Sequence, residues 1–202
     1  MMTPIKWFGF AIVWLILSCY ASAGEAVYHR QEWPSWLDED NDCLRTRDEL
    51  LTERSLVDVV VQNCRVISGM WYDPYSDRIF YHADELYNDH VVPLQWAFNH
   101  GAHHWPQDKK NQFANDPTNL QFVFTPLDRD KGEMGISEWL PPNNRFVCSY
   151  AALFQHIVDK YDLYLEPADY YVLAWCGGPW FPHVHVPLID QQLQDAQILP
   201  LD

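Results

Sequence analysis

The residues best suited to catalysis gather between Asp89 and Lys131. Asp89-His90 places a carboxylate beside an imidazole, and in an extended segment two adjacent side chains point to opposite faces. Asn119 and Asp128 follow on later pieces of the chain, and Lys131 adds a cation that suits an anionic substrate. Carboxylates are the ligands that hard cations prefer, and histidine titrates near physiological pH. This set of residues indicates a metal-dependent hydrolase.

Each of these residues also has a structural explanation when it is taken alone. An Asp-His dipeptide occurs more often on a surface or in a core than in a catalytic site. An asparagine such as Asn119 is typical of a turn. The segment 128–133, which reads Asp-Arg-Asp-Lys-Gly-Glu, is typical of the solvated start of a helix. The alternative to an enzyme is therefore a catalytically silent binding domain.

A second group of acidic residues precedes the first expected helix. Its carboxylates stand at positions 1, 3, 5 and 12 of the segment, the spacing of a calcium-binding loop. The sixth position should be glycine because the loop turns sharply there, but here it is Cys43. The alternative is an acidic lead-in in which Asp42 or Thr46 caps a helix. The candidate ligands for Ca²⁺ are Asp38, Asp40, Asp42 and Glu49.

The chain opens with the pattern of a secretory signal peptide. Lys6 is followed by an apolar stretch over 7–17 and by the small residues Ala21-Ser22-Ala23, which predicts cleavage after Ala23. The alternatives are an uncleaved membrane anchor, for which the apolar run is barely long enough, and a lipidated Cys19. We therefore expect a secreted or periplasmic protein without stable membrane association, and the sequence predicts no protein partner.

Removal of residues 1–23 leaves four cysteines, and an even number in an exported chain indicates two disulfides. Three connectivities exist, and we favour the pairing of sequence neighbours, Cys43–Cys64 and Cys148–Cys176. Each bridge would contribute about 3 kcal/mol by restricting the unfolded chain. A zinc site made by the four cysteines is the competing interpretation, and the absence of any Cys-x-x-Cys pair disfavours it.

The remaining pattern predicts short strands and helices without a βαβ rhythm, and hence the α+β class. Helices are expected from the Thr46-x-x-Glu49 capping box onward and over 94–99, 108–114, 150–161 and 167–176. A buried strand is expected over 56–62, a hairpin over 65–71 and 78–82, and a strand over 120–124. The chain divides into the signal peptide (1–23), an irregular lead-in (24–36), one domain (37–176) and a Pro-rich tail (177–202).

Acidic residues dominate the chain, whose formal charge is −15 and becomes −16 when Lys6 is removed with the signal peptide. This charge excludes nucleic-acid binding by a general basic surface. The acids could face away from the substrate, or salt could screen the repulsion. Otherwise the substrate is not ordinary DNA, or the protein is a catalytically silent exported domain. Local relief is expected from Lys109, Lys110, Arg129, Lys131 and Arg145.

Several motifs occur in the order that a known family shows. They resemble the HNH (ββα-metal) nucleases found in secreted bacterial proteins and in GmrSD-type modification-dependent restriction enzymes. The similarity covers roughly Trp36 to Cys176, and the tail from Gly177 onward lies outside it. The motifs are Asp89-His90-Val91-Val92-Pro93-Leu94, His100-Gly101-Ala102, Phe113-Ala114-Asn115-Asp116-Pro117-Thr118-Asn119-Leu120, Lys131-Gly132 and Glu138-Trp139-Leu140-Pro141-Pro142.

The resemblance implies a ββα-metal core for domain 37–176, elaborated by a hairpin and flanking helices. His90 matches the general base that deprotonates the attacking water, and Asp89 matches a metal ligand. Asn119 matches the residue that holds the loop of the base. The helical position that is usually Asn or His is Asp128 here. An aspartate is a better oxygen ligand for Mg²⁺, but it adds negative charge near the phosphate.

The basic residues Arg129 and Lys131 match a pair that is expected to contact phosphate. The resemblance thus implies an exported endonuclease that hydrolyses phosphodiester bonds of DNA, with RNA as an additional candidate substrate. Asp89 and Asp128 would hold one Mg²⁺ or Mn²⁺ ion, which relieves charge on the phosphoryl and leaving oxygens. The product is expected to carry a 5′-phosphate.

Overall fold

The computed structural model describes residues 26–177, so the expected signal peptide (1–23) and tail residues 178–202 lie outside the described residues. The described part holds two small antiparallel sheets and six α-helices, which confirms the α+β prediction. Four short 3₁₀ helices connect these elements. They are η1 (Arg30–Glu32), η2 (Ala83–Glu85), η3 (Ala102–His104) and η4 (Pro117–Asn119).

The first sheet contains β1 (Val60–Gln62), β2 (Arg65–Asp73) and β3 (Arg78–His82) in that order. The antiparallel β2–β3 pair is the expected hairpin. The buried strand expected over 56–62 is wrong, because β1 is three residues long and all three are exposed. β1 lies at the edge of the sheet and pairs only with β2, so the Val-rich pattern there does not reflect burial on two sides.

The second sheet pairs β4 (Leu86–His90) with β5 (Leu120–Phe124) in antiparallel register, and His90 faces Leu120. Helix α4 (Thr125–Lys131) follows β5 directly and contacts both strands. Pro126 stands in its first turn, where the missing backbone N–H costs nothing, so Pro126 starts this helix as well as ending the strand. Along the chain, α2 (Leu94–Asn99) and α3 (Gln107–Ala114) come between β4 and β5.

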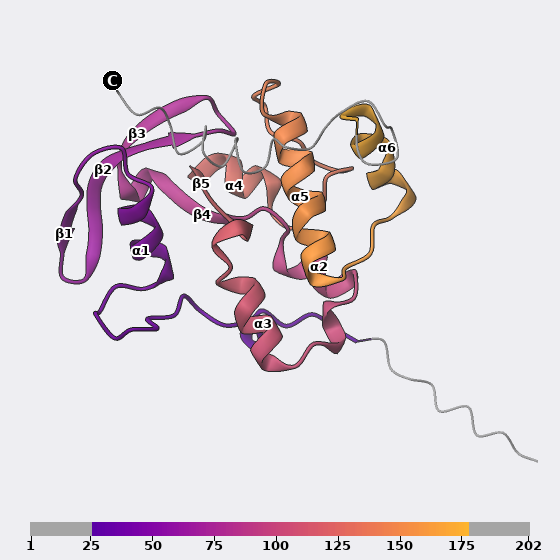
Figure 1. Cartoon of the computed structure of the whole chain (residues 1–202), viewed down its shortest axis with the longest axis horizontal. Helices are drawn as coiled ribbons and strands as arrows, with labels where there is room; N and C mark the ends of the chain where they lie inside the picture. Colours follow the sequence, from indigo (N-terminus) through magenta and orange to yellow (C-terminus); the bar gives the residue numbers. More distant parts are fainter. Residues whose placement is uncertain (1–25, 178–202) are drawn as a thin grey trace, which may run out of the picture.

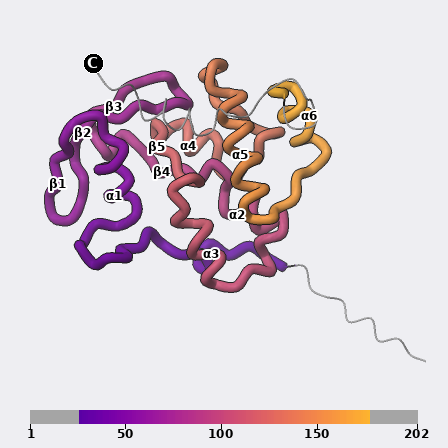
Figure 2. Tube along the Cα trace, in the orientation of Figure 1, coloured from indigo at the N-terminus to yellow at the C-terminus, as the bar shows by residue number. Residues whose placement is uncertain are grey.

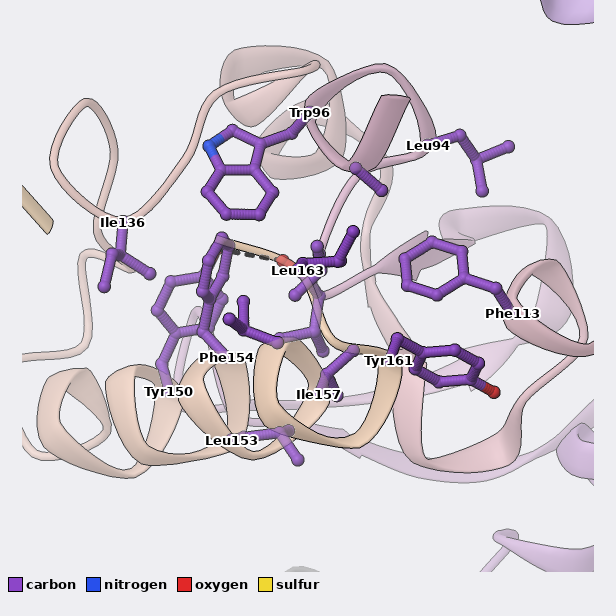
Figure 3. Close-up of a cluster of buried hydrophobic side chains, with 14 of the residues drawn as sticks. Leu94, Trp96, Phe113, Ile136, Tyr150, Leu153, Phe154, Ile157, Tyr161 and Leu163 are labelled. Atoms are coloured by element: carbon purple, nitrogen blue, oxygen red, sulfur yellow. Dashed lines mark hydrogen bonds between the residues drawn. The ribbon is translucent and has the colours of Figure 1, made fainter. Parts of the chain in front are cut away.

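Helix α5 (Val147–Tyr161) supplies one side of the larger hydrophobic core. Its stripe of six apolar residues is buried as the sequence predicts. Figure 3 shows Tyr150, Phe154 and Ile157 rising from the helix toward Trp96 and Ile136 of other segments. Trp96 and Phe154 meet edge to face with ring centroids 4.9 Å apart. The stripe comprises Tyr150, Leu153, Phe154, Ile157, Val158 and Tyr161.

A smaller core lies beneath the first sheet, where α1 (Thr46–Glu53) packs Leu50 and Leu51 against β2 and β3. The helix is at the expected place, but the capping box is wrong. Arg45 is the N-cap residue and makes no side-chain cap. The Thr46 hydroxyl instead donates to the carbonyl oxygen of Leu37 at 3.1 Å, which ties the helix to the segment before it.

Both expected disulfides are present. Cys43–Cys64 joins the segment before α1 to the turn between β1 and β2. Cys148–Cys176 joins the start of α5 to the end of α6 (Pro167–Trp175). Each bridge fixes two segments that are distant in sequence, and sequence-neighbour pairing is confirmed.

Figure 1 places β1–β3 and α1 at the left, α5 and α6 at the right, and β4, β5 and α4 between them. Figure 2 shows the segment before α1 passing α3 on its way to the first sheet. This lead-in is not separate from the domain, because Trp33 is only 3% exposed and packs edge to face on Trp105 and Phe113. No helix within residues 26–177 is long and apolar enough to span a membrane.

Candidate functional site

Asp89 lies in β4 and is held by two side chains from distant segments. One carboxylate oxygen accepts a hydrogen bond from the Lys131 ammonium at 2.7 Å, and the other accepts one from the Tyr75 hydroxyl at 2.8 Å. All three residues are buried. Burial raises the pKa of Asp89, while the Lys131 charge and these two hydrogen bonds oppose the rise. The contacts fix the position of the carboxylate in a desolvated setting.

His90 ends β4, and its ring is held on two sides. Its Nε2 lies 2.9 Å from the carbonyl oxygen of Ala114, and Trp36 stacks on the ring with centroids 5.4 Å apart. A carbonyl oxygen only accepts hydrogen bonds, so Nε2 carries the proton and the neutral ring keeps its lone pair on Nδ1. Burial lowers the pKa of His90 to about 4, so the ring is neutral at pH 7.

Asn119 is fully buried at the end of η4 and bonds to the segment that follows His90. Its side-chain oxygen accepts from the backbone N–H of Val92 at 2.8 Å, and its amide nitrogen donates to the Val92 carbonyl at 3.3 Å. Its own carbonyl accepts from the backbone N–H of Val91 at 2.9 Å. These bonds hold the backbone directly after His90 in one conformation.

Asp128 lies on α4, one turn before Lys131, and is partly buried. Burial, followed by the negative charge of Asp89, raises the pKa of Asp128 to about 6, while Lys131 and Arg129 oppose the rise. No hydrogen bond contributes to this shift. The two carboxylates therefore repel one another, and within residues 26–177 the Asp128 carboxylate forms no ion pair.

The structure brings most of the sequence-predicted site residues to one unit formed by β4, β5 and α4, but it does not bring them all within ligand distance. Asp89, His90 and Asp128 do not form a cluster whose ligand atoms all lie within 4.8 Å of one another. The phosphate contact expected of Lys131 does not fit this geometry, because its ammonium is buried and also donates to the His90 carbonyl at 2.7 Å. Arg129 is exposed on the same helix.

The acidic loop before α1 does bring its carboxylates together. Ligand atoms of Asp38, Asp40 and Asp42 lie within 4.8 Å of one another, and among the described residues no other set of three or more His, Cys, Asp or Glu does so. Burial raises the pKa of Glu49, and the neighbouring acids raise it further. Cys43 has φ +80°, so it adopts the left-handed conformation for which a glycine was expected, and its disulfide holds it there.

Two residues of the site were missed by sequence reasoning. Tyr75 stands in a turn-rich stretch that predicts exposure, yet it is fully buried and bonds to Asp89. Trp36 was assigned to the irregular lead-in, yet it stacks on His90. An aromatic residue within a turn is the one signal that points to Tyr75, whereas no local pattern identifies Trp36.

Residues 45–164 match the family described as GmrSD restriction endonucleases, C-terminal domain. The match covers more than half of the chain. The chain belongs to this family. Membership confirms the GmrSD-type resemblance and indicates a nuclease-like function.

One curated relative is a protein of Arthroderma benhamiae that carries the name "Uncharacterized secreted protein". It is 31% identical to this chain over 144 residues, which cover 70% of each protein. No solved structure matches the chain. This chain therefore has a relative described as secreted, and its two disulfides are typical of exported proteins.

Proposed function

We propose that this protein is an exported, metal-dependent endonuclease of the HNH type, with His90 as general base. The observation that carries the proposal is the geometry of His90. His90 is the last residue of β4, in a unit of two strands followed by a helix. Its Nε2 donates a hydrogen bond to the carbonyl oxygen of Ala114, which leaves the unprotonated Nδ1 free to accept a proton. Export is supported by the two disulfides and by the name of the relative from Arthroderma.

His90 would take a proton from the water that attacks the phosphorus atom, a contribution of about 10²–10⁴-fold for a general base. A pKa of about 4 makes the free ring a weak base. An anionic phosphate beside the ring would favour the protonated form and raise this pKa. Asn119 would keep the base aligned, because its bonds fix the backbone of Val91 and Val92.

Asp89 and Asp128 would hold a divalent cation, Mg²⁺ or Mn²⁺. Mg²⁺ in proteins is commonly bound by one or two carboxylates and completed by water and substrate phosphates, so two acids suffice. Asp128 suits this role because, within residues 26–177, its carboxylate forms no ion pair that would compete with a cation. Asp89 keeps free lone pairs although each oxygen already accepts one bond. When bound, the cation would relieve charge on the phosphoryl and leaving oxygens.

The test is cleavage of supercoiled plasmid by the purified protein with Mg²⁺ or Mn²⁺ and then with EDTA. We expect cleavage that EDTA abolishes, and a loss of about 10²–10⁴-fold in His90→Ala. His156→Ala is the matched control because His156 is exposed on α5, far along the chain from the unit. A His90→Ala protein that cuts as fast as the wild type would show that the assigned base is wrong.

The second candidate is a catalytically silent exported binding domain, and the Lys131–Asp89 pair is the observation that favours it. A lysine ammonium already neutralises the carboxylate that a metal would need. Absence of cleavage with either metal, together with no protection of the protein by Mg²⁺ or Mn²⁺ in thermal melting, would favour this candidate over the nuclease.

A further inference from the structure

A cleft of about 780 Å³ between α1, β2, η2 and β4 has a charge unlike that of the whole chain. Three arginines line it: Arg45, Arg47 and Arg65. Two acids, Asp48 and Asp84, line it as well, so its formal charge is +1 in a chain that carries −15. We call this cleft, with its three arginines, the arginine groove.

The three arginines of the groove differ in whether the guanidinium group already has partners within the protein. Arg47 donates to the carbonyl oxygen of Ala83 at 2.8 Å and lies 3.6 Å from Asp48, so it joins α1 to the segment before β4. Asp48 is buried and accepts from the backbone N–H of Val66, which commits its charge too. Arg45 and Arg65 are exposed. Within residues 26–177 neither of these two guanidinium groups forms an ion pair.

A disulfide fixes the spacing of the two exposed arginines. Cys43 lies two residues before Arg45, and Cys64 lies directly before Arg65. The Cys43–Cys64 bridge, with Cα atoms 5.4 Å apart, ties these two segments together, and both cysteines line the groove. The backbone at Arg45 and the backbone at Arg65 are therefore held close together, and both side chains line the same cleft, which is the arrangement expected of a site for an anion with several charges.

One residue that lines the groove also contacts the proposed catalytic site. Trp36 lines the groove and stacks on the ring of His90. Tyr87 also lines it and lies on β4, three residues before His90 and therefore about 10 Å away along the strand. Tyr87 is 51% exposed, so its aromatic ring is open to solvent in the groove. Tyr87 and His90 leave the strand on opposite faces, because they are three residues apart. Thr125, another lining residue, begins α4.

A larger cleft of about 1110 Å³ on the other side of α1 has the opposite charge. Two lysines, Lys109 and Lys160, line it together with five acids, which gives a formal charge of −3. Lys160 is already paired with Asp116 at 2.7 Å. Of these two clefts, only the arginine groove offers uncommitted positive charge to a polyanion. The five acids are Glu39, Glu49, Glu53, Asp108 and Asp116.

We propose that the arginine groove binds a single strand of nucleic acid, with phosphates at Arg45 and Arg65 and a base against Tyr87. Basic side chains beside an exposed aromatic face are the combination that single-strand sites use, since every base can stack and every phosphate is charged. Trp36, which lines the groove and stacks on the His90 ring, would connect the bound strand to the proposed base. This inference rests on the proposed nuclease function, and it names the surface that binds the substrate.

The test measures binding without cleavage, by fluorescence anisotropy of a labelled single-stranded oligonucleotide of about 20 nucleotides in EDTA. We expect Arg45→Gln/Arg65→Gln to weaken binding by on the order of 10-fold at low salt. The dependence of log affinity on log salt should become less steep by about 1.4, or about 0.7 for each lost phosphate contact on a single strand. Arg45→Lys/Arg65→Lys keeps both charges and should keep the salt dependence of the wild type.

Lys109→Gln/Lys160→Gln removes the same total charge from the other cleft and is the matched control. Equal weakening by both Gln pairs, unchanged binding in Arg45→Gln/Arg65→Gln, or no binding by the wild type would each overturn the groove. Melting temperatures of the variants establish that they are folded. If the wild type cleaves DNA with Mg²⁺ and Arg45→Gln/Arg65→Gln binds the oligonucleotide as well as the wild type, the groove is rejected but the nuclease is not. If binding depends on the two arginines but the wild type does not cleave, the nuclease is rejected but the groove is not.

Discussion

The buried Asp89–Lys131 pair and the arginine groove hold their charges in opposite ways. In the pair a carboxylate and an ammonium are removed from solvent and neutralise one another at 2.7 Å. In the groove Arg45 and Arg65 stay in solvent without an ion pair among the described residues. A buried charge must be paired because desolvation is costly, so it serves to position atoms. An exposed, unpaired charge costs little and remains available to a ligand.

This difference also explains how an acidic chain can present a site for a polyanion. Most of the cations that sequence reasoning selected are committed elsewhere. Lys109, Lys110 and Arg145 lie in ion pairs, and Lys131 is buried with Asp89. The formal charge of −15 is therefore a poor guide to the field that a substrate meets at one groove.

The largest expected effect comes from breaking the buried pair. Lys131→Met should lower the free energy of unfolding by about 3–5 kcal/mol, because it leaves the Asp89 carboxylate buried without its partner. Asp89→Asn/Lys131→Met should recover much of this loss. Lys109→Met is the control, and should cost below about 1 kcal/mol because its ion pair is exposed. Chemical denaturation measures all three, and a small loss in Lys131→Met would mean that the pair is not sealed from solvent.

The two disulfides allow the groove to be tested apart from stability. Removing either bridge, as Cys43→Ala/Cys64→Ala or Cys148→Ala/Cys176→Ala, should cost about 3 kcal/mol. Only the first pair flanks Arg45 and Arg65, so only its loss should weaken oligonucleotide binding below the melting transition. If both variants lost affinity equally, the groove would have no special dependence on its own bridge.

Local patterns in the sequence identify the elements of this fold better than they identify the partners of the charges. The stripe on α5, the β2–β3 hairpin and strand β5 follow from the period of their apolar residues. The exposure of β1 does not follow from its sequence, because a Val-rich run has the same pattern in an edge strand as in a buried strand. Likewise, the motif around Lys131 is visible in sequence, but its bond to Asp89 depends on contacts between residues 42 positions apart.

The same limit applies to the candidate site. Asp89-His90 and Asn119 could be selected from their motifs, and Asn119 does bond to the segment after His90. The arginine groove could not be selected, since Arg45 and Arg65 come together only through the Cys43–Cys64 bridge and the packing of α1 on β2. Residues that share a motif can be chosen locally, whereas residues that share a surface require the fold.

A third, smaller effect concerns pH and distinguishes His90 from Asp128, whose pKa values shift in opposite directions. The pKa of His90 is lowered from 6.5 to about 4, so its stabilising contribution is present above pH 6.5 and is lost as pH falls toward 4. The pKa of Asp128 is raised from 3.8 to about 6, so its contribution is present below pH 3.8 and is lost as pH rises through 6. The two trends oppose one another between pH 4 and 6.

In His90→Gln the first trend disappears, and unfolding free energy measured in EDTA should fall as pH rises from 4 to 6. In Asp128→Asn the second trend disappears, and stability should instead rise over the same interval, by at most about 3 kcal/mol. The Asp128 effect should be smaller because this side chain is partly exposed. Parallel pH profiles in the two variants would contradict the opposite assignments.

The smallest expected effect is at the acidic loop just before the groove, whose fully or partly exposed carboxylates form no ion pair within residues 26–177 and carry the opposite sign. If Asp38, Asp40, Asp42 and Glu49 form a calcium site, about 10 mM Ca²⁺ should stabilise the fold by about 1.4 kcal/mol for a dissociation constant near 1 mM. Asp40→Asn/Asp42→Asn should lose this gain, while Asp84→Asn in the groove should keep it. Thermal melting with Ca²⁺ and with EDTA decides the matter. An unchanged midpoint would assign these acids to solvent, and the loop would then contribute only the negative charge that the groove must overcome.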